Sequence, residues 1–297
     1  MSTRRSIDIS IFLINYNGAP FLAACLDSIL ESETTANLEL ILIDNASQDD
    51  SVSVIKPYKQ SLVFVQNEEN VGFSRANNQA EKLANGQFVF LLNTDTVLKK
   101  NTIELLYQYC RTHDVGAVTP KLLNADGSLQ CPGSVFGQWR FRQDKVREVP
   151  FIAGAAVMMK RSVYQEMDGL DENLFFYNDD IDMCKSLKRL GYPIIYFPKA
   201  SLIHYGGLSS KTRQIGSLIE GYRGGFYICR KYYGPIVYQL YRVLIVVDIL
   251  IRLFFHVCCF YSKAHRAYVK AYLEILRIDL MNDILPEKTG KKESVCS

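Results

Sequence analysis

Three carboxylates close together in the sequence, Asp179, Asp180 and Asp182, are well suited to acid–base chemistry. The residues after them predict a helix from about Ile181 to Leu190, and the positive end of a helix dipole favours ionised carboxylates. Repulsion among the three raises the pKa of at least one toward a value suited to a general base. Capping alone explains one aspartate here well and three less well. We therefore expect Asp180 to be a base, with Asp179 as its neighbour and able to contact an acceptor.

Another carboxylate, Asp95, follows the apolar run Gln87–Leu92. A carboxylate beside a buried strand is costly unless it is paired or bound to a cation. Mg²⁺ and Mn²⁺ bind oxygen ligands and often complete their shell with phosphate oxygens and water. Asp95 is therefore the expected ligand of Mg²⁺ or Mn²⁺, with Asn93 on the same side of the chain. The alternative is a cap for the helix that begins near Asn101.

His204 follows an apolar run and precedes Gly206 and Gly207. A single histidine is usually structural, but one followed by glycines beside an expected metal site is also a candidate ligand. Both alternatives stay open for His204.

Strands and helices alternate in the first 115 residues. Apolar, β-branched runs predict strands at Ile7–Tyr16, Leu38–Ile43, Leu62–Val65 and Gln87–Leu92, and helices are expected at Pro20–Leu30, from Gln48 onward, at Phe73–Ala84 and at Asn101–His113. Continuous apolar strands between helices predict an α/β fold with a mostly parallel sheet covered on both faces.

The next part of the chain is less regular. Residues Gly116–Val149 are rich in glycine and proline and are expected to form loops. A further strand is expected at Phe151–Lys160, where the small residues Gly154 to Ala156 would let a ligand or backbone approach closely, and another at Tyr192–Phe197.

Polar residues follow each of the first four expected strands. The segments are Asn15-Tyr16-Asn17, Asp44-Asn45-Ala46-Ser47, Asn67–Gly72 and Asn93-Thr94-Asp95. In such sheets ligands bind beyond the carboxyl ends of the strands, and these side chains suit a nucleoside diphosphate. Asn and Asp also favour turns and helix caps, which could explain any one segment. Four such segments on one edge favour the nucleotide site.

Composition narrows the alternatives. The chain has 297 residues, 48% apolar and 22% charged, which is a globular composition, and its net charge of +3 is too small and scattered to suggest nucleic acid. Its eight cysteines are dispersed without a C-x-x-C pair, and no signal peptide is recognisable at the start. We expect a reduced, cytoplasmic setting with mostly buried cysteines.

The run Ile236–Tyr261 is strongly apolar. As one helix it would be about 39 Å long, enough to cross a hydrocarbon core of about 30 Å. However, its charged residues would each cost about 2.5–3.5 kcal/mol at mid-bilayer. On a helical wheel the polar residues fall on about one third of the circumference: Arg242, Asp248, Arg252, His256, Lys263 and Arg266. This basic stripe favours a helix lying in the plane of an anionic membrane surface. Packing on the protein, or dimerisation, is the alternative.

The ordered motifs resemble family 2 glycosyltransferases, and most closely their bacterial rhamnosyltransferase-like branch. They are Asn15-Tyr16-Asn17-Gly18, Asp44-Asn45-Ala46-Ser47, Asn70-Val71-Gly72-Phe73, Leu92-Asn93-Thr94-Asp95, Gly154-Ala155, Gly169-Leu170-Asp171-Glu172, Asp179-Asp180-Ile181-Asp182 and His204. The resemblance covers about Ile7 to Ser210, and the ordered set is specific although each motif alone is weak.

The resemblance implies a GT-A fold, inversion at the anomeric carbon, and a divalent metal, Mg²⁺ or Mn²⁺. It implies a nucleotide-sugar site formed by Asn15, Tyr16, Asn17, Asp44, Asn45, Gly72, Asn77, Asn93 and Asp95, with Asp180 as base and His204 beside Asp95 as a metal ligand. Two residues depart from the family pattern: Asn93 replaces an aspartate of the metal motif, and Asp179 replaces the usual glutamate.

We therefore expect a GT-A catalytic domain at residues 1–212, a helical, membrane-associating region at 213–285 and a disordered tail at 286–297. The expected activity is sugar transfer from dTDP-rhamnose or a UDP-hexose to a lipid-linked or growing saccharide of the cell surface. Such an enzyme would lie on the inner face of the cell membrane, bind no nucleic acid and could oligomerise. The alternatives are a sugar nucleotidyltransferase and a non-catalytic membrane-associated scaffold.

Overall fold

The computed structural model describes residues 6–132, 138–206, 214–258 and 263–281. The chain forms two compact units. The first, here the catalytic unit, comprises Met1–Asp171 and Asp179–Ser209; the second, the C-terminal unit, comprises Glu172–Asn178 and Ser210–Ser297. The expected boundary at residue 212 and the expected tail from 286 lie outside the described residues. The sequence did not indicate that the loop 172–178 belongs with the C-terminal helices.

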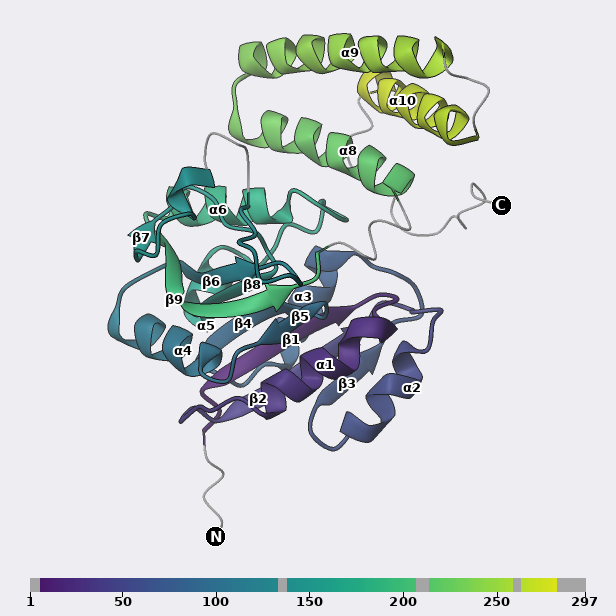
Figure 1. Ribbon diagram of the computed structural model, residues 1–297. Helices are drawn as coiled ribbons and strands as arrows, with labels where there is room; N and C mark the ends of the chain where they lie inside the picture. The colour runs from purple at the N-terminus through teal and green to yellow at the C-terminus, as the bar shows by residue number, and fades with distance from the viewer. Residues whose placement is uncertain (1–5, 133–137, 207–213, 259–262, 282–297) are drawn as a thin grey trace. The chain divides into compact units, whose positions relative to one another are not determined.

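The elements follow one another along the chain as shown in Figure 1. The strands are β1 (Ile9–Asn15), β2 (Leu38–Asp44), β3 (Val63–Gln66), β4 (Phe88–Asn93), β5 (Thr96–Leu98), β6 (Ala117–Leu123), β7 (Arg147–Glu148), β8 (Ala156–Lys160) and β9 (Ile194–His204). The helices are α1 (Ala19–Leu30), α2 (Ser51–Ile55), α3 (Phe73–Leu83), α4 (Thr102–Thr112), α5 (Arg161–Glu166), α6 (Asp179–Arg189), α8 (Gln214–Tyr232), α9 (Pro235–Cys258) and α10 (Lys263–Met281), with 3₁₀ turns at Lys56–Tyr58 and Gln138–Arg140.

One nine-stranded sheet forms the centre of the catalytic unit. Its order is β3-β2-β1-β4-β8-β6-β9-β5, with β7 paired to β9. The strands β1 to β4 are parallel, and β8 runs antiparallel to both β4 and β6. The carboxyl ends of β1 to β4 and of β6 and β9 therefore share one edge with the amino end of β8. The predicted α/β fold with a mostly parallel sheet is confirmed.

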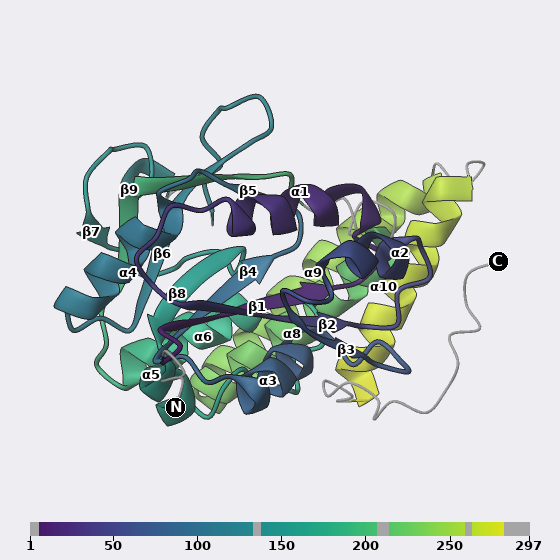
Figure 2. The ribbon, with the colours of Figure 1, turned by 90° about the horizontal axis from the view of Figure 1, so that it is seen from below.

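Helices cover both faces of this sheet because alternate side chains of each buried strand point to opposite faces. On one face Ile11, Leu13 and Leu42 pack with α1, α2 and α4, and on the other Phe12 and Ile43 pack with α3, α5 and α6. Figure 2 shows α1 on one side of the strands and α3 and α5 on the other. Of the six described cysteines, the four at 25, 110, 184 and 229 are buried, as expected.

Residues 116–149, expected to be rich in loops, also contain a strand that the sequence did not indicate, since β6 lies inside the sheet between β8 and β9. Proline removes a ladder donor and argues against an interior strand, so Pro120 concealed β6. The pairing of β6 with β9 shifts register between Pro120 and Lys121, which accommodates the proline. In addition, β8 begins at Ala156 rather than Phe151, and β9 continues to His204 instead of ending at Phe197.

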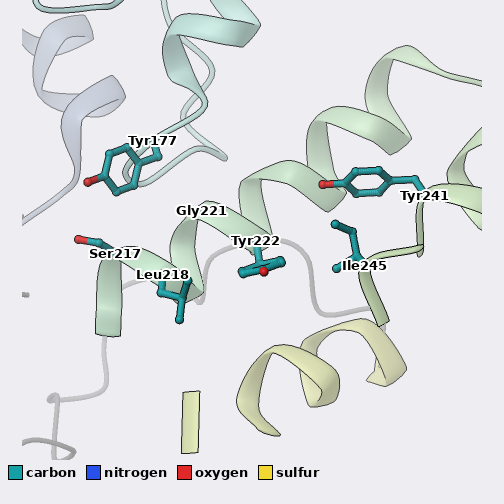
Figure 3. Close-up of a pocket in the computed structure, with 7 residues that line it drawn as sticks. All are labelled: Tyr177, Ser217, Leu218, Gly221, Tyr222, Tyr241 and Ile245. Carbon is teal, nitrogen blue, oxygen red and sulfur yellow. The ribbon is translucent and has the colours of Figure 1, made fainter. Parts of the chain in front are cut away.

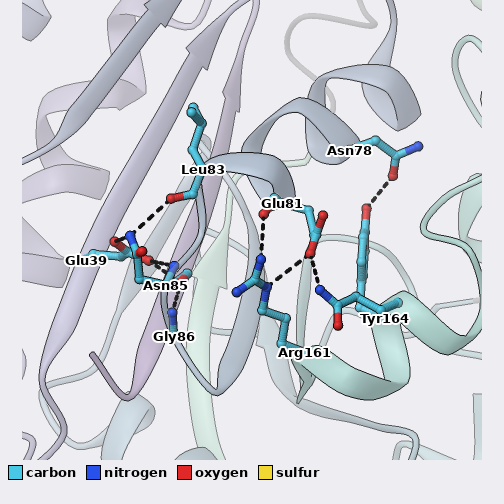
Figure 4. Close-up of polar contacts among 10 residues, drawn as sticks. Glu39, Asn78, Glu81, Leu83, Asn85, Gly86, Arg161 and Tyr164 are labelled. Carbon is cyan, nitrogen blue, oxygen red and sulfur yellow. Dashed lines mark hydrogen bonds and ion pairs between the residues drawn. The ribbon is translucent and has the colours of Figure 1, made fainter. Parts of the chain in front are cut away.

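Polar contacts fix α3 against the sheet and α5 (Figure 4). Glu81 accepts hydrogen bonds from Arg161 (3.0 Å) and Gln165 (2.7 Å) of α5. Asn78 accepts from the Tyr164 hydroxyl (2.7 Å) and from the backbone N–H of Leu170 (3.0 Å), and donates to the carbonyl of Leu170 (2.9 Å). With this part of α3 held, its first residues stay at the edge where the strands end.

The C-terminal unit consists of α8, α9 and α10 with the loop 172–178, and two charged residues of α9 have partners on the neighbouring helices. Arg242 pairs with the buried Asp279 of α10 (2.6 Å). Asp248 accepts hydrogen bonds from Arg252 (2.7 Å) and from the Tyr222 hydroxyl of α8 (3.1 Å). This stripe is therefore only partly directed at its surroundings: Arg242 and Asp248 have partners on α10 and α8, which the helical wheel could not show, whereas the Arg252 side chain is 53% exposed.

The opposite face of α9 is apolar and exposed. Eleven large apolar side chains are between 48% and 77% exposed, namely Ile236, Val237, Leu240, Val243, Leu244, Val247, Leu250, Ile251, Phe254, Phe255 and Val257. Monomeric proteins rarely leave so large an apolar surface in water. Of the helices that the structure describes, none combines the length and the apolar character needed to cross a bilayer.

Replacing Asn78 tests the anchoring of α3. We expect Asn78→Ala to lower the free energy of unfolding by about 2–3 kcal/mol, because the polar groups of Tyr164 and Leu170 lose buried partners. Tyr164→Phe, which removes one of the same hydrogen bonds, should cost about 1 kcal/mol. Urea unfolding measures both, with the exposed Asn101→Ala as control. Equal effects of the Asn78 and Asn101 variants would contradict the proposed anchor.

Candidate active site

The ends of β1 and β2 are joined by a buried polar cluster. The Asn15 side chain donates to Asp44 Oδ1 (2.8 Å) and to Ser47 Oγ (3.0 Å), while Ser47 donates to Asp44 Oδ1 (2.6 Å) from its hydroxyl and to Oδ2 (3.0 Å) from its backbone. Asn15 and Asp44 are fully buried. Their side chains therefore fix the two loops in place, and a direct contact with a nucleobase stays a prediction for both.

The loops themselves carry unusual backbone. Asn17 and Ala46 have φ values of +53° and +59°, in the left-handed region that most residues avoid. Hydrogen bonds hold both the backbone and the side chain of Asn17. Its backbone N–H donates to Ser47 Oγ (2.9 Å), and its side-chain Oδ1 accepts from the backbone N–H of Gln48 (2.7 Å). Such strain is typical of functional sites. Tyr16 and Asn17 are half-buried at this edge.

A second polar cluster joins β2, β3 and α3. Asn45 donates to the carbonyl of Gly72 (3.2 Å) and accepts from Asn67 (2.8 Å). Gly72 has φ +88°, which favours glycine, and immediately precedes α3. Asn77 donates to the Phe73 carbonyl (2.9 Å), and its Oδ1 is buried without a hydrogen-bond partner. The sequence-predicted residues on β2 and α3 are thus brought together at one edge.

Asp95 and His204 meet through strand pairing. β5 runs antiparallel to β9 with Thr96 opposite His204, and the backbone N–H of Tyr205 donates to the Asp95 carbonyl (2.9 Å). This register places His204 Nε2 3.3 Å from Asp95 Oδ1, and both side chains are largely buried. The expected neighbourhood of Asp95 and His204 is therefore present, although His204 ends a strand rather than occupying a loop after it.

Gln130 sets the orientation of the His204 ring. Its side-chain nitrogen donates to Asn124 Oδ1 (3.0 Å), so its Oε1, 2.6 Å from His204 Nδ1, accepts the proton of that nitrogen. In the neutral ring the Nε2 lone pair then faces the Asp95 carboxylate, and Nε2 is buried without a hydrogen-bond partner. The sequence offered no signal for Gln130, since it lies in the segment expected to be irregular.

This pair of atoms fits a divalent cation. Two ligand atoms at right angles, each about 2.1 Å from an ion, lie about 3.0 Å apart, close to the observed 3.3 Å. A nitrogen and a carboxylate oxygen that face each other are repulsive unless a proton or a cation lies between them. Within the described residues no three His, Cys, Asp or Glu side chains gather in a metal site, so phosphate or water oxygens would complete the shell.

Asp179 and Asp180 begin α6 and have perturbed pKa values. Burial, together with the negative charges of Asp180 and Asp182, raises the pKa of Asp179 to about 7. Burial raises the pKa of Asp180 to about 6, and hydrogen bonds from the backbone N–H groups of Ile181 and Gly154 oppose this rise. The backbone donors therefore favour the ionised form of Asp180, while Asp179 holds its proton to higher pH. Such a pair can supply a base near neutral pH.

The small-residue segment before β8 joins the two halves of the site. The backbone N–H of Asn93 donates to the Ala155 carbonyl (2.9 Å). A Cβ atom on the neighbouring Gly154 would lie 3.5 Å from Asp179 Oδ2. The strand end that leads to Asp95 and the Asp179–Asp180 pair therefore contact adjacent residues of one short segment. An arrangement of this kind can hold a cation and a general base on either side of one short segment.

Comparisons with known proteins identify the family of this chain. Residues 10–167, just over half of the 297-residue chain, match Glycosyl transferase family 2. The glycosyltransferase GlyG of Streptococcus pneumoniae serotype 4 is 32% identical over 123 residues, 40% of this chain and 40% of GlyG. The N-acetylglucosaminyl-diphospho-decaprenol L-rhamnosyltransferase of Mycobacterium tuberculosis is 24% identical over 233 residues, 66% of this chain and 76% of that protein.

The fold has relatives among solved structures. The mannosyltransferase PcManGT of Pyrobaculum calidifontis, solved with GDP-Man and Mn²⁺, is similar with a TM-score of 0.58 and 16% identity, over 94% of this chain and 88% of that chain. At this identity the likeness shows the fold alone. The family match shows more than the fold: the chain belongs to glycosyl transferase family 2 and has the GT-A fold.

Proposed function

We propose that this protein is an inverting glycosyltransferase that moves a sugar from a nucleoside-diphosphate sugar to a saccharide or lipid-linked saccharide acceptor. The observation that carries the proposal is the Asp179–Asp180 pair, whose pKa values are raised to about 7 and about 6, beside the segment that contacts the end of β4. Direct displacement by an acceptor hydroxyl requires a base whose pKa is near neutral, because the base must accept the proton of that hydroxyl.

In the proposed reaction Asp180 takes the proton of the acceptor hydroxyl as its oxygen attacks the anomeric carbon. The backbone N–H groups of Ile181 and Gly154 hold the Asp180 carboxylate, and burial beside the negative charges of Asp180 and Asp182 raises the pKa of Asp179. Because one displacement occurs, the configuration at the anomeric carbon inverts. The bond to the diphosphate breaks with its electrons on the leaving phosphate oxygen.

The donor would lie along the edge formed by Asn15, Tyr16, Asn17, Asp44, Asn45, Gly72, Asn77, Asn93 and Asp95. His204 and Asp95 would hold Mg²⁺ or Mn²⁺, which when bound offsets the charge that develops on the diphosphate. With one carboxylate and one imidazole, the protein supplies little negative charge, so the diphosphate of the donor should contribute to metal affinity. PcManGT was solved with Mn²⁺, which supports a divalent ion.

Relatives suggest the substrate class. The mycobacterial relative is an L-rhamnosyltransferase that acts on a diphospho-decaprenol acceptor, which favours dTDP-rhamnose as donor and a polyprenyl-linked acceptor; a UDP-hexose is the second candidate. A sugar nucleotidyltransferase would need a glycine-rich phosphate loop after the first strand, and Asn17-Gly18-Ala19-Pro20 is not one. A non-catalytic scaffold would not need the half-buried Asp179–Asp180 pair.

Replacing each aspartate identifies the base. We expect Asp180→Asn to lower kcat by about 10²–10⁴-fold without weakening nucleotide binding, because the amide cannot accept the proton. Asp179→Asn should cost about tenfold. In the unchanged enzyme kcat/KM should fall as the pH drops below about 6, because the base must be deprotonated and burial raises the pKa of Asp180 to about 6.

Release of nucleoside diphosphate in the presence of acceptor measures these rates, and calorimetry measures nucleotide binding. The exposed Asp126→Asn is the matched control. A larger loss for Asp179→Asn than for Asp180→Asn would move the base to Asp179. No turnover of any donor by the unchanged protein would favour the scaffold.

Removal of metal ligands tests the second half of the site. We expect His204→Ala and Asp95→Asn each to weaken Mn²⁺ binding in the presence of nucleoside diphosphate by about 100-fold, and Gln130→Met by about tenfold because the His204 ring loses its orientation. Electron paramagnetic resonance of free Mn²⁺ measures this without turnover. The exposed His113→Ala serves as control. Unchanged Mn²⁺ affinity in both ligand variants would exclude Asp95 and His204 as the metal site.

We also propose that the exposed face of α9 binds a membrane surface, which would place the enzyme on the inner face of the cell membrane beside a lipid-linked acceptor. The helix has 24 residues, about 36 Å, and its eleven exposed apolar side chains recur at helical spacing along it. Arg242 and Asp248 have partners on α10 and α8, so apolar insertion rather than attraction to anionic lipid should dominate.

Flotation with vesicles tests this proposal. We expect the protein to float with phosphatidylcholine vesicles even in 1 M salt, where the Debye length is about 3 Å. The double variant Leu244→Glu, Ile251→Glu should stay in solution, whereas Leu30→Glu, at an exposed leucine of α1, should float. If the unchanged protein ignores vesicles but forms dimers that the double variant lacks, the face is a dimer interface instead.

A further inference from the structure

A cavity of about 340 Å³ lies within the C-terminal unit (Figure 3). Three tyrosines line it from three segments: Tyr177 from the loop 172–178, Tyr222 from α8 and Tyr241 from α9. Ser217 and Gly221 of α8 also line it, and the two remaining lining residues are aliphatic. Its volume falls at the lower end of the roughly 300–1,000 Å³ typical of small-molecule sites.

Two of the tyrosines have fixed positions. The Tyr222 hydroxyl donates to Asp248 of α9 (3.1 Å). The Tyr241 hydroxyl lies against Gly225 of α8, where a Cβ atom would be only 2.6 Å away. Their rings therefore form a rigid aromatic lining. A rigid lining favours binding because no free energy is lost in ordering these side chains when a ligand binds.

The loop that carries Tyr177 is held in a strained shape. Tyr177 and Asn178 have consecutive φ values of +66° and +64°, a conformation that residues with side chains avoid. The Asn178 side chain donates to the Gly221 carbonyl (3.1 Å) and packs against Gly224, where a Cβ atom would be 2.5 Å from its nitrogen. The packing of Asn178 therefore explains why Gly224 must be glycine.

Gly221 has no such explanation. Glycine is unfavourable inside a helix relative to alanine, yet a Cβ atom at Gly221 would meet nothing within 4 Å. The missing side chain leaves open the cavity that Gly221 lines. The open space at Gly221 thus belongs to the cavity, whereas Gly216, which also has open space at its Cβ position, lies outside it.

We infer that this cavity binds an uncharged sugar ring of the acceptor. The inference rests on the proposed function. None of the seven lining residues is charged, so the cavity does not suit a diphosphate, whereas aromatic rings and a serine hydroxyl match the apolar faces and hydroxyl groups of a sugar. Tyr177 and Asp179 are two residues apart, so chain connectivity keeps their Cα atoms within about 7 Å. The loop that carries Tyr177 leads along the chain directly into Asp179 and Asp180.

Saturation-transfer NMR on the full chain tests the inference with methyl glycosides of N-acetylglucosamine, glucose, galactose, mannose and rhamnose. We expect at least one to bind, and Gly221→Leu to weaken that binding at least tenfold while the melting temperature does not fall. The matched control is Gly216→Leu, also on α8 with open space at Cβ but outside the cavity. If Gly221→Leu does not fold, Ser217→Trp replaces it and should give the same loss.

Binding of UDP and dTDP with Mn²⁺, measured by calorimetry on the same samples, should be unchanged in all variants. Absence of binding by all five glycosides overturns the inference, as does equal binding in the Gly221→Leu and Gly216→Leu proteins. Farnesyl phosphate is tested as a competitor of the glycosides. If it displaces a bound glycoside, and if Gly221→Leu abolishes the binding of farnesyl phosphate but not that of the glycoside, the cavity is assigned to lipid and the inference is overturned. If the unchanged protein binds neither UDP nor dTDP, the proposed function is contradicted instead.

Discussion

The antiparallel pairing of β5 with β9 is the constraint on which the candidate active site depends. β5 has only three residues, yet its register with β9 alone brings the carboxylate of Asp95 to the ring of His204. Gln130 completes the arrangement by fixing which nitrogen of the ring carries a proton. A change of one residue in this register would point one of the two side chains to the opposite face of the sheet and destroy the pair.

The sequence predicted what local patterns determine. Strands β1, β2 and β4 were recognisable because both faces are largely buried and their residues are almost continuously apolar, and the position of the polar residues at one edge followed from the parallel topology. The pair Asp179–Asp180 was recognisable from its place at a helix start. Strand β6 was missed because Pro120 breaks the pattern, and Gln130 because its role comes from a contact 74 residues away in the chain. The inward orientation of Arg242 depends on Asp279, which no helical wheel of α9 contains.

The two units divide the proposed work. The catalytic unit has two polar clusters: the buried Asn–Asp–Ser cluster of β1 and β2, and the amide cluster of β2, β3 and α3. Most polar groups in each cluster form hydrogen bonds with other members of the same cluster. They act as a rigid edge on which the half-buried Tyr16, Asn17 and Asn93 are presented. In the C-terminal unit, glycines on α8 receive Asn178 and Tyr241, so the loop that leads directly into Asp179 is shaped by helices from the end of the chain.

The two faces of α9 have different roles. Its inner face, with Arg242, Asp248 and Ile249, holds the three helices together, whereas its outer apolar residues have no part in that packing. The outer face can therefore change during evolution without loss of the fold. Related enzymes could adapt to other membranes, or become fully water-soluble, by substitutions on one side of a single helix.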